Sequence, residues 1–185
     1  MPSFSKKKVG YFVGTAFAVF ITYFFIVGPP WSFVVADYYR RALPIQLETV
    51  DGPITGSDLD LMTALAPLRH EACGGALFHL TEATLDLIQK NGLSFFDNAV
   101  QGRGYPDGHQ KSYFYRYAAW QETPATENMR KNSAWVGLVC MKLGNEMERK
   151  IEQAANEPGS YFTTVHEAVL LVVPRLGFVV LLYFG

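Results

Sequence analysis

The amino-acid sequence predicts an all-α membrane protein with a small helical soluble head between two apolar ends. Three observations lead to this prediction: an uncharged apolar run near the N-terminus, apolar residues at helical spacing in the middle, and a second apolar run at the C-terminus. They divide the 185 residues into a transmembrane anchor at 1–36, a helical soluble domain at 37–160, and an apolar helix at 161–185. This last helix is expected in the membrane or at an interface.

The N-terminal run begins after the lysines at 6–8 and is strongly apolar over residues 9–27. A helix of that length rises about 28 Å, enough for the hydrocarbon core of a bilayer. The prolines at 29–30 are expected to end it, because proline lacks the backbone donor. A cleaved signal peptide is the alternative, with small residues at 34–36 as its cleavage site. The length of the run favours an uncleaved anchor.

Two main helices are predicted in the middle of the chain. Apolar residues at helical spacing predict the first at 67–90, with Gly92 as a left-handed C-cap. The second is predicted at 124–156, with Thr123 as its N-cap and the residues 157–159 as its stop. A helix of that length extends about 50 Å, more than a small domain buries alone. Part of it is therefore expected to pack on another protein.

The C-terminal segment approaches a membrane span over 168–185, but Pro174 and Arg175 interrupt it. An arginine near mid-membrane costs at least about 2.5 kcal/mol on insertion scales. Proline also frees a carbonyl that a lipid-facing helix satisfies poorly. We therefore expect the segment to pack against protein, with Arg175 paired to a carboxylate or a lipid phosphate at a subunit boundary. A snorkelling arginine on an interfacial helix is the alternative.

Two further groups of residues are candidate contacts or cross-links. The aromatic residues Tyr113, Tyr115 and Trp120 are candidate partner or lipid contacts, because Tyr and Trp are enriched at interfaces; packing in a core is their commoner fate. Cys73 and Cys140 fall on the apolar faces of the two predicted main helices, and antiparallel packing in an oxidising compartment would join them. Two buried free thiols are the alternative, slightly favoured because free cysteine is commonly buried.

No catalytic, cofactor or metal site is predicted. His70, Cys73 and His79 do not share one helical face, and His166-Glu167 lacks the second histidine of a zinc-binding helix. The net charge of −1 and pI near 6.4 give no basic field for nucleic acid. The sequence therefore predicts a protein that is not an enzyme and has neither cofactor nor metal.

By elimination, the predicted role is that of an accessory structural subunit of a multi-subunit complex in an energy-transducing inner membrane. The mitochondrial inner membrane is favoured and a bacterial inner membrane is the alternative. The expected partners are other membrane-protein subunits and lipid, not nucleic acid. Two other functions stay open: an inner-membrane component of a bacterial secretion or conjugation apparatus, and a membrane-bound enzyme whose site the sequence does not reveal.

Overall fold

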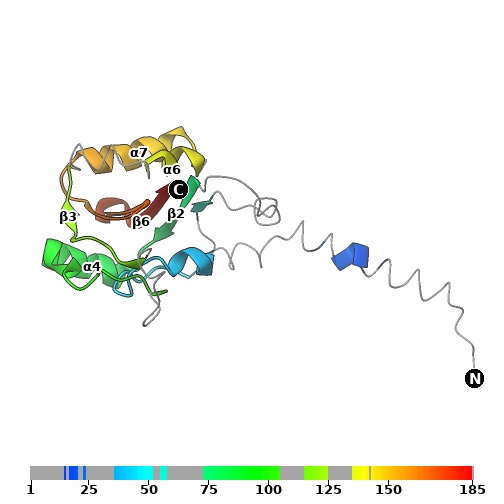
Figure 1. The fold of residues 1–185 in the computed structure, drawn as a ribbon, viewed down its shortest axis with the longest axis horizontal. Helices are drawn as coiled ribbons and strands as arrows, with labels where there is room; N and C mark the ends of the chain where they lie inside the picture. Colours follow the sequence, from blue (N-terminus) through cyan, green and yellow to red (C-terminus); the bar gives the residue numbers. More distant parts are fainter. Residues whose placement is uncertain are drawn as a thin grey trace, which may run out of the picture.

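The fold is built on a six-stranded antiparallel sheet with the strand order β1-β2-β6-β5-β4-β3. The computed structural model describes residues 15, 17–20, 23, 36–51, 55–57, 73–104, 115–124, 135–141 and 143–184. The strands are β1 (Thr55–Ser57), β2 (Cys73–His79), β3 (Gln121–Glu122), β4 (Tyr161–Val165), β5 (Ala168–Val173) and β6 (Phe178–Phe184). Figure 1 shows this sheet between a layer containing α4 and a layer containing α6 and α7.

The central hairpin of β5 and β6 explains why the C-terminal run is so apolar. Its register pairs Ala168 with Tyr183 at one end and Val173 with Phe178 at the other. Side chains along β5 alternate between the two faces, and both faces are covered, so nearly every one is buried. A strand buried on both sides reads as a continuous apolar run, which is also how a membrane helix reads.

The turn of this hairpin contains the residues that interrupted the predicted helix. Pro174–Leu176 form the short 3-10 helix η4, and Gly177 follows in the left-handed region at φ 72°. Gly177 donates its N–H to the carbonyl of Pro174 at 3.1 Å. The predicted apolar helix at 161–185 is therefore wrong, because the segment folds as β4, β5 and β6.

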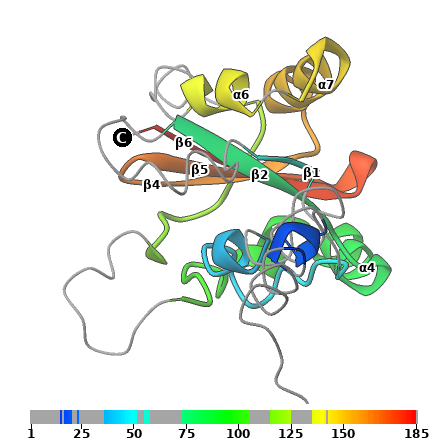
Figure 2. The same cartoon turned by 90° about the vertical axis from the view of Figure 1, so that its right-hand side faces the viewer.

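The helices that cover the sheet are shorter than those predicted. They are α4 (Glu82–Asn91), the 3-10 helix η1 (Gly92–Phe96), α6 (Val136–Cys140) and α7 (Asn145–Asn156). Thr81 caps α4 by accepting the N–H of Thr84. Gly92 ends the helix, as predicted, but with φ 56° and ψ −135° it does not adopt the predicted left-handed helical conformation. Figure 2 shows α4 on one side of the sheet and α6 and α7 together on the other.

The structure contradicts the all-α prediction in the middle of the chain as well. Part of the helix predicted at 67–90 is β2, and the helix begins only at Glu82. The helix predicted at 124–156 is broken, because Gly144 at φ 87° separates α6 from α7. The hydroxyl of Thr123 donates to the carbonyls of Glu157 and Ser160, and the start of the predicted helix at 125–134 lies outside the described residues. A glycine with a positive φ, such as Gly144, departs from right-handed helix geometry.

One finding bears on the predicted membrane location. Within the part of the chain that the structure describes, no helix has the length and hydrophobicity needed to cross a membrane. This contradicts the predicted location in an inner membrane. Most of the predicted anchor at 1–36 lies outside the described residues, and residues 15, 17–20 and 23 of it are helical.

Candidate functional site: the helix α6 and its disulfide

The helix α6 lies against β2 and β6, at the end of the sheet where β2 begins. A disulfide joins Cys140, the last residue of α6, to Cys73, the first residue of β2, with Cα atoms 5.9 Å apart. The sequence slightly favoured two free thiols over a bridge, and it placed both cysteines on long helices. The structure bridges them, and it places Cys73 on a strand.

Glycine lets α6 approach the sheet unusually closely. A Cβ atom at Gly137 would lie 2.4 Å from the carbonyl oxygen of Gly74 and 2.6 Å from that of Tyr183. On the strand side, a Cβ at Gly75 would lie 2.6 Å from the sulfur of Met141. The helix backbone therefore rests on the sheet backbone, and Leu138 and Met141 fill the space beside it as fully buried residues.

The opposite side of α6 presents apolar side chains to solvent. Val139 is 72% exposed and Val136 is 46% exposed. Beside them lies α7, which Figures 1 and 2 both place on the same face of the sheet. An apolar centre next to a polar rim is the usual arrangement of a protein interface.

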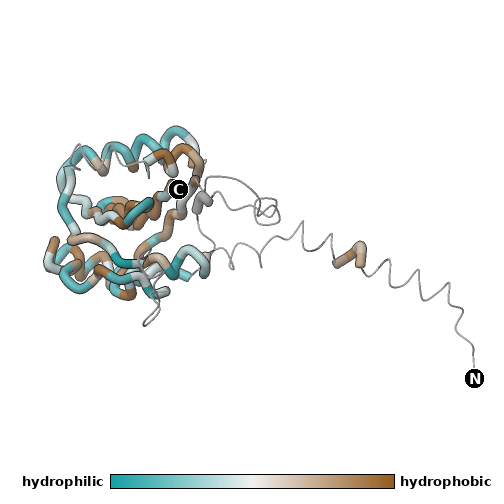
Figure 3. The backbone as a smooth tube through the Cα atoms, in the orientation of Figure 1, coloured by the Kyte–Doolittle hydropathy of each residue, from teal (hydrophilic) through white to brown (hydrophobic). Residues whose placement is uncertain are grey.

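The outward side of α7 provides this polar rim. Glu146 accepts a hydrogen bond from Lys150 at 2.7 Å, and this bond lowers the pKa of the Glu146 carboxyl. Arg149 and Asn156 donate to backbone carbonyls of their own helix at 3.1 and 2.7 Å. Figure 3 shows α7 as a mostly hydrophilic helix above hydrophobic strands.

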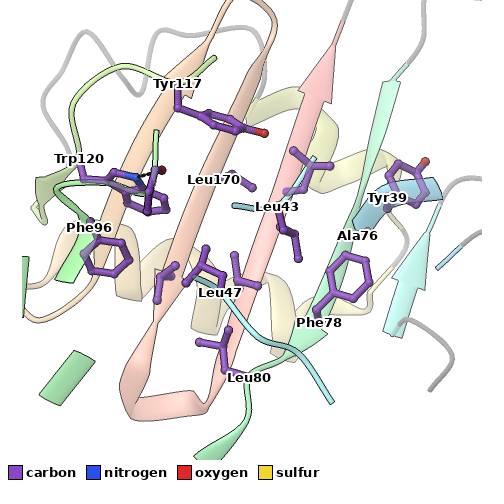
Figure 4. Packing of buried hydrophobic residues seen from close by; sticks show 14 of the residues in the cluster. Tyr39, Leu43, Leu47, Ala76, Phe78, Leu80, Phe96, Tyr117, Trp120 and Leu170 are labelled. Atoms are coloured by element: carbon purple, nitrogen blue, oxygen red, sulfur yellow. Dashed lines mark hydrogen bonds between the residues drawn. The ribbon is translucent and has the colours of Figure 1, made fainter. Parts of the chain in front are cut away.

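The three aromatic residues that the sequence predicted as partner or lipid contacts lie in different surroundings. Trp120 is buried: its ring stacks on Phe96 with centroids 4.4 Å apart, and its indole N–H donates to the carbonyl of Ala99 at 2.7 Å (Figure 4). It therefore packs within this chain and offers little surface to a partner. Tyr115 is partly buried beside Gly104, and its partner contact stays a prediction. Tyr113 lies outside the described residues.

Arg175 pairs with a carboxylate of its own chain. Its guanidinium donates to Glu157 at 2.6 Å, which joins η4 to the residue after α7. Two hydrogen bonds, first from Gln153 and then from Arg175, hold the pKa of the Glu157 carboxyl below its ordinary value. Both partners of the ion pair are partly exposed, so water screens it.

Two arginines on the other side of the sheet form a second candidate site. Arg103 donates to the carbonyl of Leu47 at 2.5 Å, while Arg40 donates to Thr49 at 3.2 Å and lies 5.7 Å from the Phe78 ring centroid. Burial lowers the pKa of the Arg103 guanidinium, and the charge of Arg40 lowers it further. Because these guanidinium groups bind groups of their own chain, we assign them to folding rather than to ligand binding.

The histidines do not form a metal site within the described part of the chain, where no group of three or more His, Cys, Asp or Glu residues could hold a metal ion. His79 ends β2 and His166 lies 3.3 Å from Glu167 in the turn after β4. His70 lies outside the described residues.

Sequence reasoning missed the exposed side of α6. The sequence predicted one long helix at 124–156 and assigned no role to Gly137 or Val139. The pair Gly144-Asn145 was the available signal, because glycine followed by asparagine favours a break in a helix. Nothing in a single sequence indicates that the helix approaches the sheet closely at Gly137.

Comparison with known proteins gives no match: no family model matches the sequence, and no curated protein or solved structure is significantly similar to the chain.

Proposed function

We propose that the protein is a structural subunit of a multiprotein assembly, that it performs no catalysis itself, and that it contacts a partner subunit through α6. The observation that carries this proposal is the exposure of Val139 and Val136 on a helix that is fixed to the sheet. Exposed apolar side chains on a rigid element lose little conformational entropy when they are buried by a partner. The partner surface would itself be apolar, with polar groups facing α7.

The disulfide favours a location of the protein in a compartment that oxidises thiols. Cysteine pairs form and persist in secretory, periplasmic and similar environments, whereas reducing compartments keep them as thiols. A bridge between Cys73 and Cys140 also restrains α6, the helix that we assign to the contact. The proposed assembly therefore forms after oxidation of this pair.

Native electrophoresis of the endogenous protein tests the proposal, combined with the charged substitution Val139→Asp. The unchanged protein should migrate well above its monomer mass of 20.7 kDa, and Val139→Asp should shift it toward that mass. A carboxylate at this position would be desolvated by the partner surface, which is costly.

Leu87→Asp is the matched control, because Leu87 is also exposed on a helix but lies on α4 at the opposite face. It should leave migration unchanged. Circular dichroism of both variants confirms that they fold. A chain that runs alone at its monomer mass, or that assembles equally well with Val139→Asp, would contradict the proposal.

A further inference from the structure

The disulfide matters to the fold most at α6, a short helix whose backbone rests on β2 and β6 but which buries few side chains of its own. It contains only five residues, and isolated helices much shorter than about 12 residues are not stable in water. Its inward side chains are limited to Leu138 and Met141, since Gly137 contributes none. The bond between Cys140 and Cys73 is its one covalent link to the sheet.

The neighbouring elements have attachments of their own. The hydrogen-bonded register of β2 with β6 runs from Cys73 opposite Phe184 to His79 opposite Phe178. The helix α7 is held by Ile151, Ala154 and Ala155, all buried, and Gly144 at φ 87° separates it from α6. Loss of the disulfide therefore removes support from α6 while the sheet and α7 keep theirs.

Both cysteines are only partly buried, so a dithiol in solution can reach the bond. A thiolate of the dithiol attacks one sulfur and expels the other, forming a mixed disulfide. The second thiol of the reductant resolves it. Two electrons and two protons pass to Cys73 and Cys140, which become thiols, and the dithiol leaves as its own disulfide.

We propose that the Cys73–Cys140 disulfide is a redox-sensitive latch, and that its reduction by a dithiol releases α6 from the sheet without unfolding the rest of the domain. Release uncovers Leu138 and Met141 together with apolar side chains of β2 and β6 in the same cluster. Oxidation returns α6 to the sheet. The inference stands apart from the proposed function, because it concerns the isolated chain.

Hydrogen exchange measured by mass spectrometry, on the full chain before and after treatment with dithiothreitol, tests the latch. Alkylation of the two thiols verifies reduction. We expect amide exchange in residues 136–141 to accelerate by about tenfold or more, while exchange in β5 and β6 changes less than about twofold. The double variant Cys73→Ser/Cys140→Ser should show the fast α6 exchange without reductant and should not respond to it.

Three results would overturn the latch. If α6 exchange does not change on reduction, the bond does not hold the helix. If α6 and the central strands accelerate together, the bond is a cross-link for the whole fold. If dithiothreitol leaves the thiols unavailable to alkylation in the folded protein, no dithiol reaches the bond.

Discussion

The two faces of the sheet are covered by different kinds of chain. One face packs on residues 36–47, α4 and the irregular segments around Phe96 and Trp120, and its core is rich in aromatic rings (Figure 4). The other packs on α6 and α7, and its core is mainly aliphatic, with Phe162 and Phe178 as its buried aromatic rings and with alanine and glycine at the closest contacts. The same strands thus support two layers: one in which helices alternate with irregular chain, called here the irregular layer, and one built mainly of α6 and α7, called the helical layer.

The difference shows what each kind of layer requires. Irregular chain leaves buried carbonyls that need a donor. Side chains provide it: Tyr117 donates to Ala42 at 2.8 Å and Trp120 to Ala99 at 2.7 Å. A helix satisfies the hydrogen bonds of its own backbone. The helical layer therefore needs no such donors, and small residues let its helices approach the sheet closely. Where that helix is very short, as in α6, a disulfide adds the missing support.

The largest effect is expected from Trp120→Ala on the irregular side. Removing a buried aromatic ring costs about 3–5 kcal/mol of unfolding free energy. This ring also stacks on Phe96, and its loss leaves the carbonyl of Ala99 without its donor. Urea unfolding followed by circular dichroism measures the change. Trp120→Phe keeps a ring but loses the N–H, so it should cost clearly less.

A loss below about 1 kcal/mol for Trp120→Ala would contradict this account of the irregular layer, since surface substitutions already reach about 0.5 kcal/mol. The ring would then be a surface group, as the partner-contact hypothesis requires.

The helical side gives the next effect, through Gly137→Ala. The added methyl group would overlap backbone atoms of Gly74 and Tyr183, so α6 must move away from the sheet. Overpacking of this kind costs about 1–3 kcal/mol. Val136→Ala is the matched control on the same helix, because Val136 points outward and its change should stay within about 0.5 kcal/mol. Equal effects of both substitutions would show that α6 does not rest on the sheet backbone.

These two regions also differ in how far the sequence predicts them. The end of α4 at Gly92 and the stop after α7 follow from local rules that need no tertiary contact. The strands do not follow from local rules. A run such as 168–173 is apolar on both faces, so the spacing of its apolar residues does not distinguish a strand from a helix. The valines in β5 and β6 favour strands, and Pro174 with Gly177 favours a turn, but the run is also long enough for a membrane helix.

The candidate site was predictable only in part. Two cysteines in one chain allow a single bridge, so Cys73 and Cys140 could be named as its candidates. The exposure of Val139 could not be foreseen, because it depends on where the predicted long helix breaks. Arg175 was expected to pair with a carboxylate or a lipid phosphate at a subunit boundary. Its partner is Glu157 of the same chain, which comes close because η4 and the end of α7 meet.

A smaller effect, and a pH dependence, is expected from Tyr117→Phe. The lost hydrogen bond to Ala42 should cost about 0.5–1.5 kcal/mol at neutral pH. Burial raises the pKa of the Tyr117 hydroxyl above its ordinary value of 10.0, so the fold favours the neutral form. The resulting stability is fully present below the unfolded pKa and is lost as the pH rises through the folded one.

The unchanged protein should therefore lose unfolding free energy more steeply than Tyr117→Phe above about pH 10. Urea unfolding at a series of alkaline pH values measures both slopes. Parallel slopes would mean that Tyr117 ionises as easily in the fold as in the unfolded chain.

The smallest effect is expected from Arg175→Leu. Arg175 lies in the turn between β5 and β6 and pairs with Glu157 at the end of α7. The pair of Arg175 with Glu157 is partly exposed, so its removal should change stability little.

The substitution should show more clearly in the pKa of the Glu157 carboxyl, which hydrogen bonds from Gln153 and Arg175 hold below the ordinary value of 4.5. A lowered folded pKa gives stability that is present above the unfolded value and is lost as the pH falls through the folded one. An NMR titration of the Glu157 side chain should show a higher pKa both in Arg175→Leu and in Gln153→Leu. The difference in stability between neutral and acidic pH should shrink in both variants. If Arg175→Leu leaves the Glu157 pKa unchanged, the arginine is not paired within the chain, and a carboxylate on another subunit again becomes its expected partner.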